Sequence, residues 1–83
     1  MDLELLARVV NTPGISGFED AVQELVAQEM RGVCDEVRRD RLGNVIGLKR
    51  ACRAGDRPIR VALAAHVDEI GAIVKGVDAD GYI

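Results

Sequence analysis

The chain begins with apolar residues at helical spacing. Leu3, Leu6, Val9 and Val10 follow Asp2 at intervals that would place them on one side of a helix. This pattern predicts a short amphipathic helix over residues 2–11, which the run Thr12-Pro13-Gly14 would end.

A second apolar stripe of helical spacing starts soon after this break. Its members are Phe18, Val22, Leu25, Val26 and Met30, and Gly32 follows as a C-terminal stop. Ser16 and Glu19 stand three positions apart, as in a capping box, so Ser16 is predicted to cap this helix. Both helices are interpreted as packing elements.

From Val33 the pattern changes to one typical of strands. Alternation over residues 33–38 predicts one strand, residues 40–44 (DRLGN) a turn, and residues 45–49 a second strand. A polar loop is expected over residues 50–57. Residues 59–65 are almost all apolar and predict a strand covered on both faces, and residues 70–77 predict a further one. The expected fold class is therefore α/β, with two N-terminal helices followed by strands of a mixed sheet.

The last predicted turn, Asp78-Ala79-Asp80-Gly81, opens a hairpin whose returning arm has only Tyr82 and Ile83. So short an arm offers little to pair with. We therefore expect these residues to be the N-terminal part of a longer protein.

Composition narrows the functional classes. With 83 residues, 48% of them hydrophobic and 30% charged, the chain is expected to fold as one small domain. Phe18 and Tyr82 are the only aromatic residues and the net charge is −3, which counts against a nucleic-acid or carbohydrate groove. Cys34 and Cys52 are too far apart for a metal clip and are expected to be buried free thiols. The acidic N-terminus and short apolar runs favour a cytoplasmic protein with no membrane span.

The only histidine lies at the end of the apolar run, in "ALAAHVDEIG". In a strand, His66 and Asp68 would point to one face, and Val67 and Glu69 to the other. A metal-ligating histidine usually gives its second ring N–H to a carboxylate, and Asp68 is placed for that role. A divalent cation would also compensate the charges that end a buried strand. The alternative stays open on spacing alone: His66 ends the strand and hydrogen-bonds locally beside a solvated turn.

Other functions fit less well. A catalytic zinc takes at least three protein ligands, which this chain cannot readily supply, so the others are expected elsewhere. An endoglucanase would need Asp68 and Glu69 to flank one bond, but neighbouring strand residues point to opposite faces. A non-enzymatic α/β module that pairs with a partner through its last strand is the main alternative to an enzyme.

Three segments together resemble a known family. "PGISGFED", "DRLGN" and "ALAAHVDEIGAIV" occur in the order found at the start of the tetrahedral aminopeptidases, also called deblocking or glutamyl aminopeptidases, in the di-metal peptidase clan MH. The likeness covers essentially the whole chain, and His-x-Asp-Glu-Ile-Gly is its most specific part. Val67 departs slightly from it, because many relatives have Met there.

The resemblance implies a metal-dependent aminopeptidase that acts on short peptides, with a phosphorylase/hydrolase-like di-zinc peptidase domain. It implies that His66 ligates one of two divalent ions, usually zinc or cobalt, and that Asp68 is the carboxylate, often counted as catalytic, that orients His66. Glu69, Ile70 and Gly71 match the motif as structural residues. Residues 1–77 would belong to the catalytic domain and residues 78–83 would begin an inserted β-rich domain that assembles dimers into a dodecamer. The general base and the other ligands would lie beyond this chain.

Overall fold

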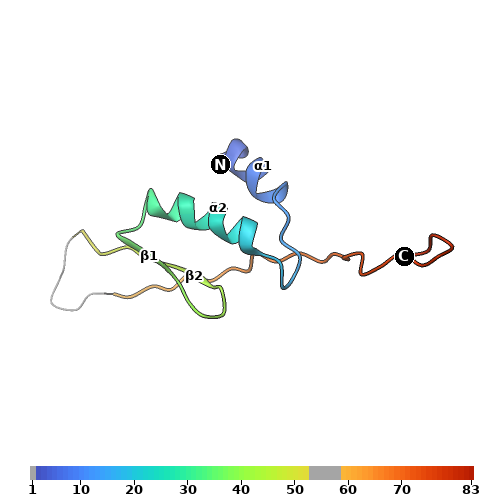
Figure 1. The fold of residues 1–83 in the computed structure, drawn as a ribbon. Helices are drawn as coiled ribbons and strands as arrows, with labels where there is room; N and C mark the ends of the chain where they lie inside the picture. The colour runs from blue at the N-terminus through green and yellow to red at the C-terminus, as the bar shows by residue number, and fades with distance from the viewer. Residues whose placement is uncertain (1, 53–58) are drawn as a thin grey trace.

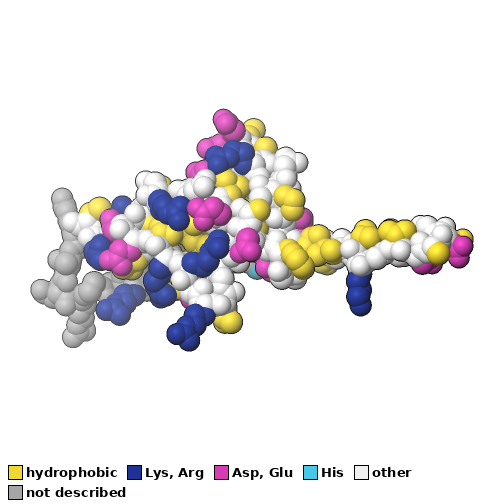
Figure 2. Space-filling model, in the orientation of Figure 1, with side chains coloured by type: hydrophobic (Ala, Val, Ile, Leu, Met, Phe, Trp, Pro, Cys, Tyr) yellow, Lys and Arg dark blue, Asp and Glu magenta, His cyan; other side chains and the backbone are white. Residues whose placement is uncertain are grey.

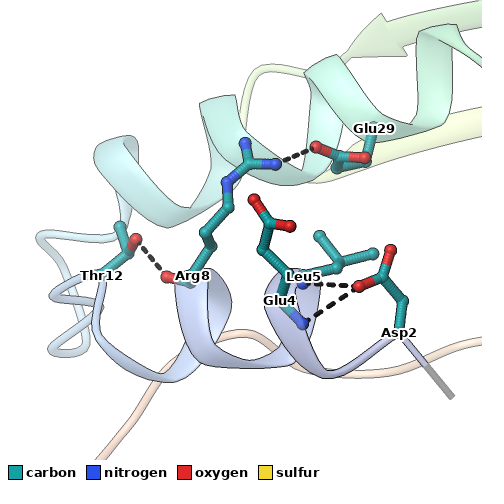
Figure 3. Close-up of polar contacts among 6 residues, drawn as sticks. All are labelled: Asp2, Glu4, Leu5, Arg8, Thr12 and Glu29. Atoms are coloured by element: carbon teal, nitrogen blue, oxygen red, sulfur yellow. Dashed lines mark hydrogen bonds and ion pairs between the residues drawn. The ribbon is translucent and has the colours of Figure 1, made fainter.

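The computed structural model of the protein describes residues 2–52 and 59–83. Its first element, α1 (Leu3–Val10), confirms the first predicted helix. The Asp2 carboxylate accepts the backbone N–H groups of Glu4 and Leu5, each at 3.0 Å (Figure 3). These bonds satisfy donors that have no partner within the helix, so Asp2 fixes where α1 begins.

The second helix, α2 (Asp20–Arg31), is confirmed, as is its end at Gly32. The predicted capping box is wrong, because Glu19 is the N-cap and its side chain makes no capping bond. Ser16 lies earlier, in a turn closed by the Phe18 N–H on the Ile15 carbonyl at 2.7 Å. Gly17 has a φ of 87°, which takes the chain out of the helical direction between Ser16 and the helix.

The two strands predicted on either side of the DRLGN turn are confirmed. β1 (Glu36–Arg39) and β2 (Val45–Leu48) pair antiparallel, with Glu36 opposite Leu48 and Arg39 opposite Val45. The Asp40 carboxylate accepts the N–H groups of Leu42 and Asn44 in the turn between them. Gly43 takes a φ of 92° there, a conformation that glycine adopts without a steric cost.

The small core lies around α2. Val22 and Ala27 are its buried apolar side chains, at 2% and 5% exposure. Arg8 of α1 donates to Glu29 of α2 at 2.8 Å across the helix pair (Figure 3). α2 contacts both strands, so the helix and the hairpin form one packed unit.

The prediction for the cysteines is only half correct. Both are free, but Cys34 is half-buried and Cys52 is exposed. Cys34 lies over the hairpin, where a Cβ placed on Gly47 would come within 2.7 Å of its Sγ. Gly47 thus leaves the space that the Cys34 side chain occupies.

The strands predicted at residues 59–65 and 70–77 are wrong. No strand is formed at residues 59–65 or 70–77, and Ile59, Val61 and Leu63 are 88%, 79% and 95% exposed. A strand needs a neighbouring backbone along its length, and among the described residues the one bridge to this segment joins Glu69 to Ile15. The turn predicted at residues 78–81 does form, with the Asp78 N–H on the Tyr82 carbonyl at 2.9 Å.

The result is an elongated molecule. Its radius of gyration is 17.9 Å, whereas a compact chain of this length would have one of about 12 Å. Figure 1 shows the C-terminal segment, coloured orange to red, running away from the helices, and Figure 2 shows apolar side chains along that segment. Among the described residues, two helices and a two-stranded antiparallel sheet fit the α/β class, in place of the predicted mixed sheet. In the part of the chain that is described, neither helix has the length and apolar character to cross a bilayer.

Candidate metal site

His66 and Asp68 face each other on the extended segment. Nδ1 of His66 lies 3.0 Å from Oδ1 of Asp68 and 3.1 Å from the Asp68 carbonyl oxygen. Because both neighbours are acceptors, the proton of a neutral imidazole belongs on Nδ1. The other ring nitrogen, Nε2, then carries the lone pair that a metal ion would accept.

The pair lies at the surface. The His66 side chain is 86% exposed and that of Asp68 is 43% exposed. His66 therefore presents its ring to solvent. The position predicted for it, at the end of a buried strand, is not what the structure has.

Ser16 is the second partner of Asp68. Its Oγ donates to Oδ2 of Asp68 at 2.7 Å, so the two carboxylate oxygens serve two different side chains. The hydrogen bond from Ser16, and after it the one from His66, lowers the pKa of Asp68 below its ordinary value. Both bonds favour the charged carboxylate, which is the form that can hold the Nδ1 proton of His66.

Glu69 contacts the same loop at a different residue, Gly14. Its backbone N–H donates to the Gly14 carbonyl at 2.8 Å, and its carboxylate accepts the Gly14 N–H at 3.2 Å. Next to it, Ile15 occupies the space over Gly71, where an added Cβ would lie 2.6 Å from the isoleucine Cγ1. Residues 14–16 and 68–71 thus form one contact, which we call the loop contact.

Ser16 and Gly14 belong to this site, although the sequence pattern does not predict them there. The spacing of Ser16 and Glu19 predicts a helix cap, although two glycines within "PGISG" are typical of a turn rather than of a helix start. The contact itself joins residues 52 positions apart. Periodicity carries no information on such a distant pair.

The described residues fit one part of a metal site. His66 with a carboxylate on Nδ1 is the arrangement that metal-binding histidines have. Over residues 2–52 and 59–83, no group of three or more His, Cys, Asp and Glu side chains could hold a metal ion. His66 is therefore a single candidate donor, and further ligands would have to come from other residues.

A family of known proteins has a sequence profile that matches part of the chain. The sequence profile of the M42 glutamyl aminopeptidases matches residues 43–83, which include β2, His66 and Asp68. No solved structure matches the chain significantly.

Several curated proteins are similar to the chain over nearly all of its length. A lysyl aminopeptidase of Pyrococcus furiosus is 42% identical over 100% of the chain and 23% of its own length. Putative aminopeptidases of Acetivibrio thermocellus and Escherichia coli (SgcX) are 32% and 37% identical, each over 96% of the chain. The chain spans only 23% and 21% of these two relatives.

Proposed function

The chain belongs to the M42 glutamyl aminopeptidase family, and on this premise we propose that His66 and Asp68 form part of a metal-dependent aminopeptidase site. The substrates would be short peptides, from which N-terminal residues are removed. One observation carries the proposal: Nδ1 of His66 is held by Asp68 at 3.0 Å, which leaves Nε2 for a metal.

In this proposal His66 would hold one of two divalent ions, zinc or cobalt. Such ions polarise a scissile carbonyl and lower the pKa of bound water. Asp68 keeps the Nδ1 proton in place and so fixes the tautomer and the direction of the imidazole. Asp68 is charged at neutral pH already at its ordinary pKa, and the hydrogen bonds from Ser16 and His66 lower that pKa further.

We further propose that the chain is the N-terminal segment of a longer cytoplasmic enzyme. Its exposed apolar residues, among them Leu63 at 95% and Ile70 at 104%, support this, because they suit strands of a sheet that additional chain would complete. Residues 1–77 would belong to an α/β di-zinc peptidase domain. Residues 78–83 would begin an inserted domain through which the enzyme forms dimers and a dodecamer.

Metal content and peptidase activity of the full-length protein test the proposal. We expect bound divalent ions, and loss of both metal and activity in His66→Ala. Asp68→Asn should weaken metal binding about 10–100-fold, as is typical when the partner of a ligating histidine is changed. Asp80→Asn, a carboxylate change at an exposed turn, is the matched control and should match the wild type.

A full-length protein without divalent ions, or with unchanged peptidase activity in His66→Ala, would contradict the proposal. The non-enzymatic alternative predicts that outcome.

A further inference from the structure

Asp68 has both of its carboxylate oxygens engaged. Oδ1 lies 3.0 Å from His66 Nδ1 and Oδ2 accepts from Ser16 Oγ at 2.7 Å. The last torsion of an aspartate side chain is broad, so a single bond to His66 would leave the carboxylate plane free to turn. The second bond, on the other oxygen, removes that freedom.

Ser16 is itself held firmly enough to act as a support. It lies in the turn closed by the 2.7 Å bond between Phe18 and Ile15. The residues on its N-terminal side belong to the loop contact, through the two hydrogen bonds of Gly14 to Glu69. The hydroxyl of Ser16 therefore approaches Asp68 from a backbone that is tied to the residue next to Asp68.

The hydrogen bond between Ser16 and Asp68 is expected to add little to the free energy of unfolding. Ser16 and Asp68 are both exposed, so water replaces the hydroxyl easily and the net gain from the bond is small. A water molecule in the same place would not fix the orientation of the Asp68 carboxylate. The contact fixes the orientation of a carboxylate whose other oxygen faces the only histidine of the chain.

The geometry points to Ser16 as a positioning residue for His66. Its hydroxyl holds the Asp68 carboxylate in the plane from which Oδ1 meets Nδ1, and this fixes the direction in which Nε2 would meet a metal ion. This inference rests on the proposed function, because it concerns the same histidine. It adds a residue from the N-terminal loop, 50 positions earlier than His66 in the chain.

The test is the affinity of the full-length, metal-depleted protein for Zn²⁺, measured by competition with a chelator. Loss of a direct partner of a ligating histidine costs about 10–100-fold, and Ser16 is one bond further away, so Ser16→Ala should cost about 3–10-fold. Ser16→Thr keeps a hydroxyl and should restore most of the affinity. In the reloaded enzyme, Ser16→Ala should lower kcat with little change in KM.

Thr12→Val is the matched control. Thr12 also donates a 2.7 Å hydrogen bond from its hydroxyl, but to the Arg8 carbonyl at the end of α1 (Figure 3). This variant should bind Zn²⁺ like the wild type. Equal losses in Thr12→Val and Ser16→Ala would assign the effect to a loosened loop and overturn the inference.

The experiment distinguishes the positioning role of Ser16 from the metal-binding role of His66. If His66→Ala loses Zn²⁺ affinity and Ser16→Ala keeps it, the role of Ser16 is wrong and the metal site stands. If His66→Ala also keeps its Zn²⁺ affinity, the proposed function itself is wrong. If Ser16→Thr is as weak as Ser16→Ala, the hydroxyl is not what matters and the inference on Ser16 is again wrong.

Discussion

Glu69 holds Gly14 with both its backbone and its side chain. The N–H of Glu69 donates to the Gly14 carbonyl at 2.8 Å, and its carboxylate accepts the Gly14 N–H at 3.2 Å. Gly14 is buried, so its N–H has little access to water as an alternative acceptor. The acid that follows Asp68 in the sequence thus supports the loop that contacts Asp68.

The variant Glu69→Ala tests whether the Glu69 side chain supports the loop at Gly14. Without the carboxylate, the Gly14 N–H loses its acceptor, and we expect its amide hydrogen exchange to become about two- to fivefold faster, equivalent to about 0.5–1 kcal/mol. Glu69→Gln retains an acceptor oxygen and is the control. Equal exchange rates in Glu69→Ala and the wild type would show that the side-chain bond contributes nothing.

Gly71 should not accept a larger side chain. A Cβ there would lie 2.6 Å from Cγ1 and 2.7 Å from Cδ1 of Ile15, so Gly71→Ala forces the isoleucine to move. We expect a loss of about 1 kcal/mol in the free energy of unfolding, at the lower end of overpacking costs because Ile15 is only half-buried.

Gly76→Ala is the matched control for this change, since an added Cβ there meets nothing within 4 Å. It should leave stability unchanged or raise it slightly through the unfolded chain. Denaturant unfolding of both variants measures the difference. A Gly71→Ala variant as stable as Gly76→Ala would mean that Ile15 does not pack there.

The cap of α1 gives a third prediction. Asp2→Ala leaves the N–H groups of Glu4 and Leu5 without their acceptor, and we expect α1 to lose about 1 kcal/mol of stability. Asp2→Asn keeps a capping oxygen and should lose less. Hydrogen exchange of the first turn of α1 distinguishes the two variants, and the prediction fails if they exchange alike.

The parts that were predictable from sequence are those set by neighbours in the chain. Asp2 caps α1 and Gly32 ends α2 because the bonds involved span a single helical turn. The hairpin was predictable for the same reason, since Asp40 and Asn44 close it locally.

What the sequence did not predict depends on distant residues. Residues 59–65 have the composition of a buried strand, yet a strand forms only beside another, and composition does not say which residues lie alongside. Ser16 and Glu19 have the spacing of a capping box, but Gly17, at a φ of 87°, separates Ser16 from α2. Its partner Asp68 lies 3.0 Å from His66 Nδ1, two positions away in the chain, whereas the hydroxyl of Ser16 reaches it only through the fold.

The turn between β1 and β2 is expected to make the stability of the fold depend on pH. The side-chain amide of Asn44 donates to Asp40 Oδ2 at 2.8 Å, and this bond is the largest cause that lowers the pKa of Asp40 below its ordinary value. A carboxyl whose pKa is lower in the folded state stabilises the fold above its unfolded pKa, about 3.9 for Asp. That stabilisation is lost as the pH falls from there through the folded pKa.

Asn44→Ala should therefore raise the pKa of Asp40 toward its ordinary value and weaken the pH dependence of stability below pH of about 4. The rise should be partial, because the N–H groups of Leu42 and of residue 44 still donate to Oδ1, both at 2.9 Å. A titration of the Asp40 carboxyl carbon by NMR measures the change. Asn11→Ala removes an amide that donates to the Ala7 carbonyl at 2.7 Å, and as the matched control it should leave the pKa of Asp40 where it is. An unchanged Asp40 titration in Asn44→Ala would mean that the backbone donors alone set this pKa.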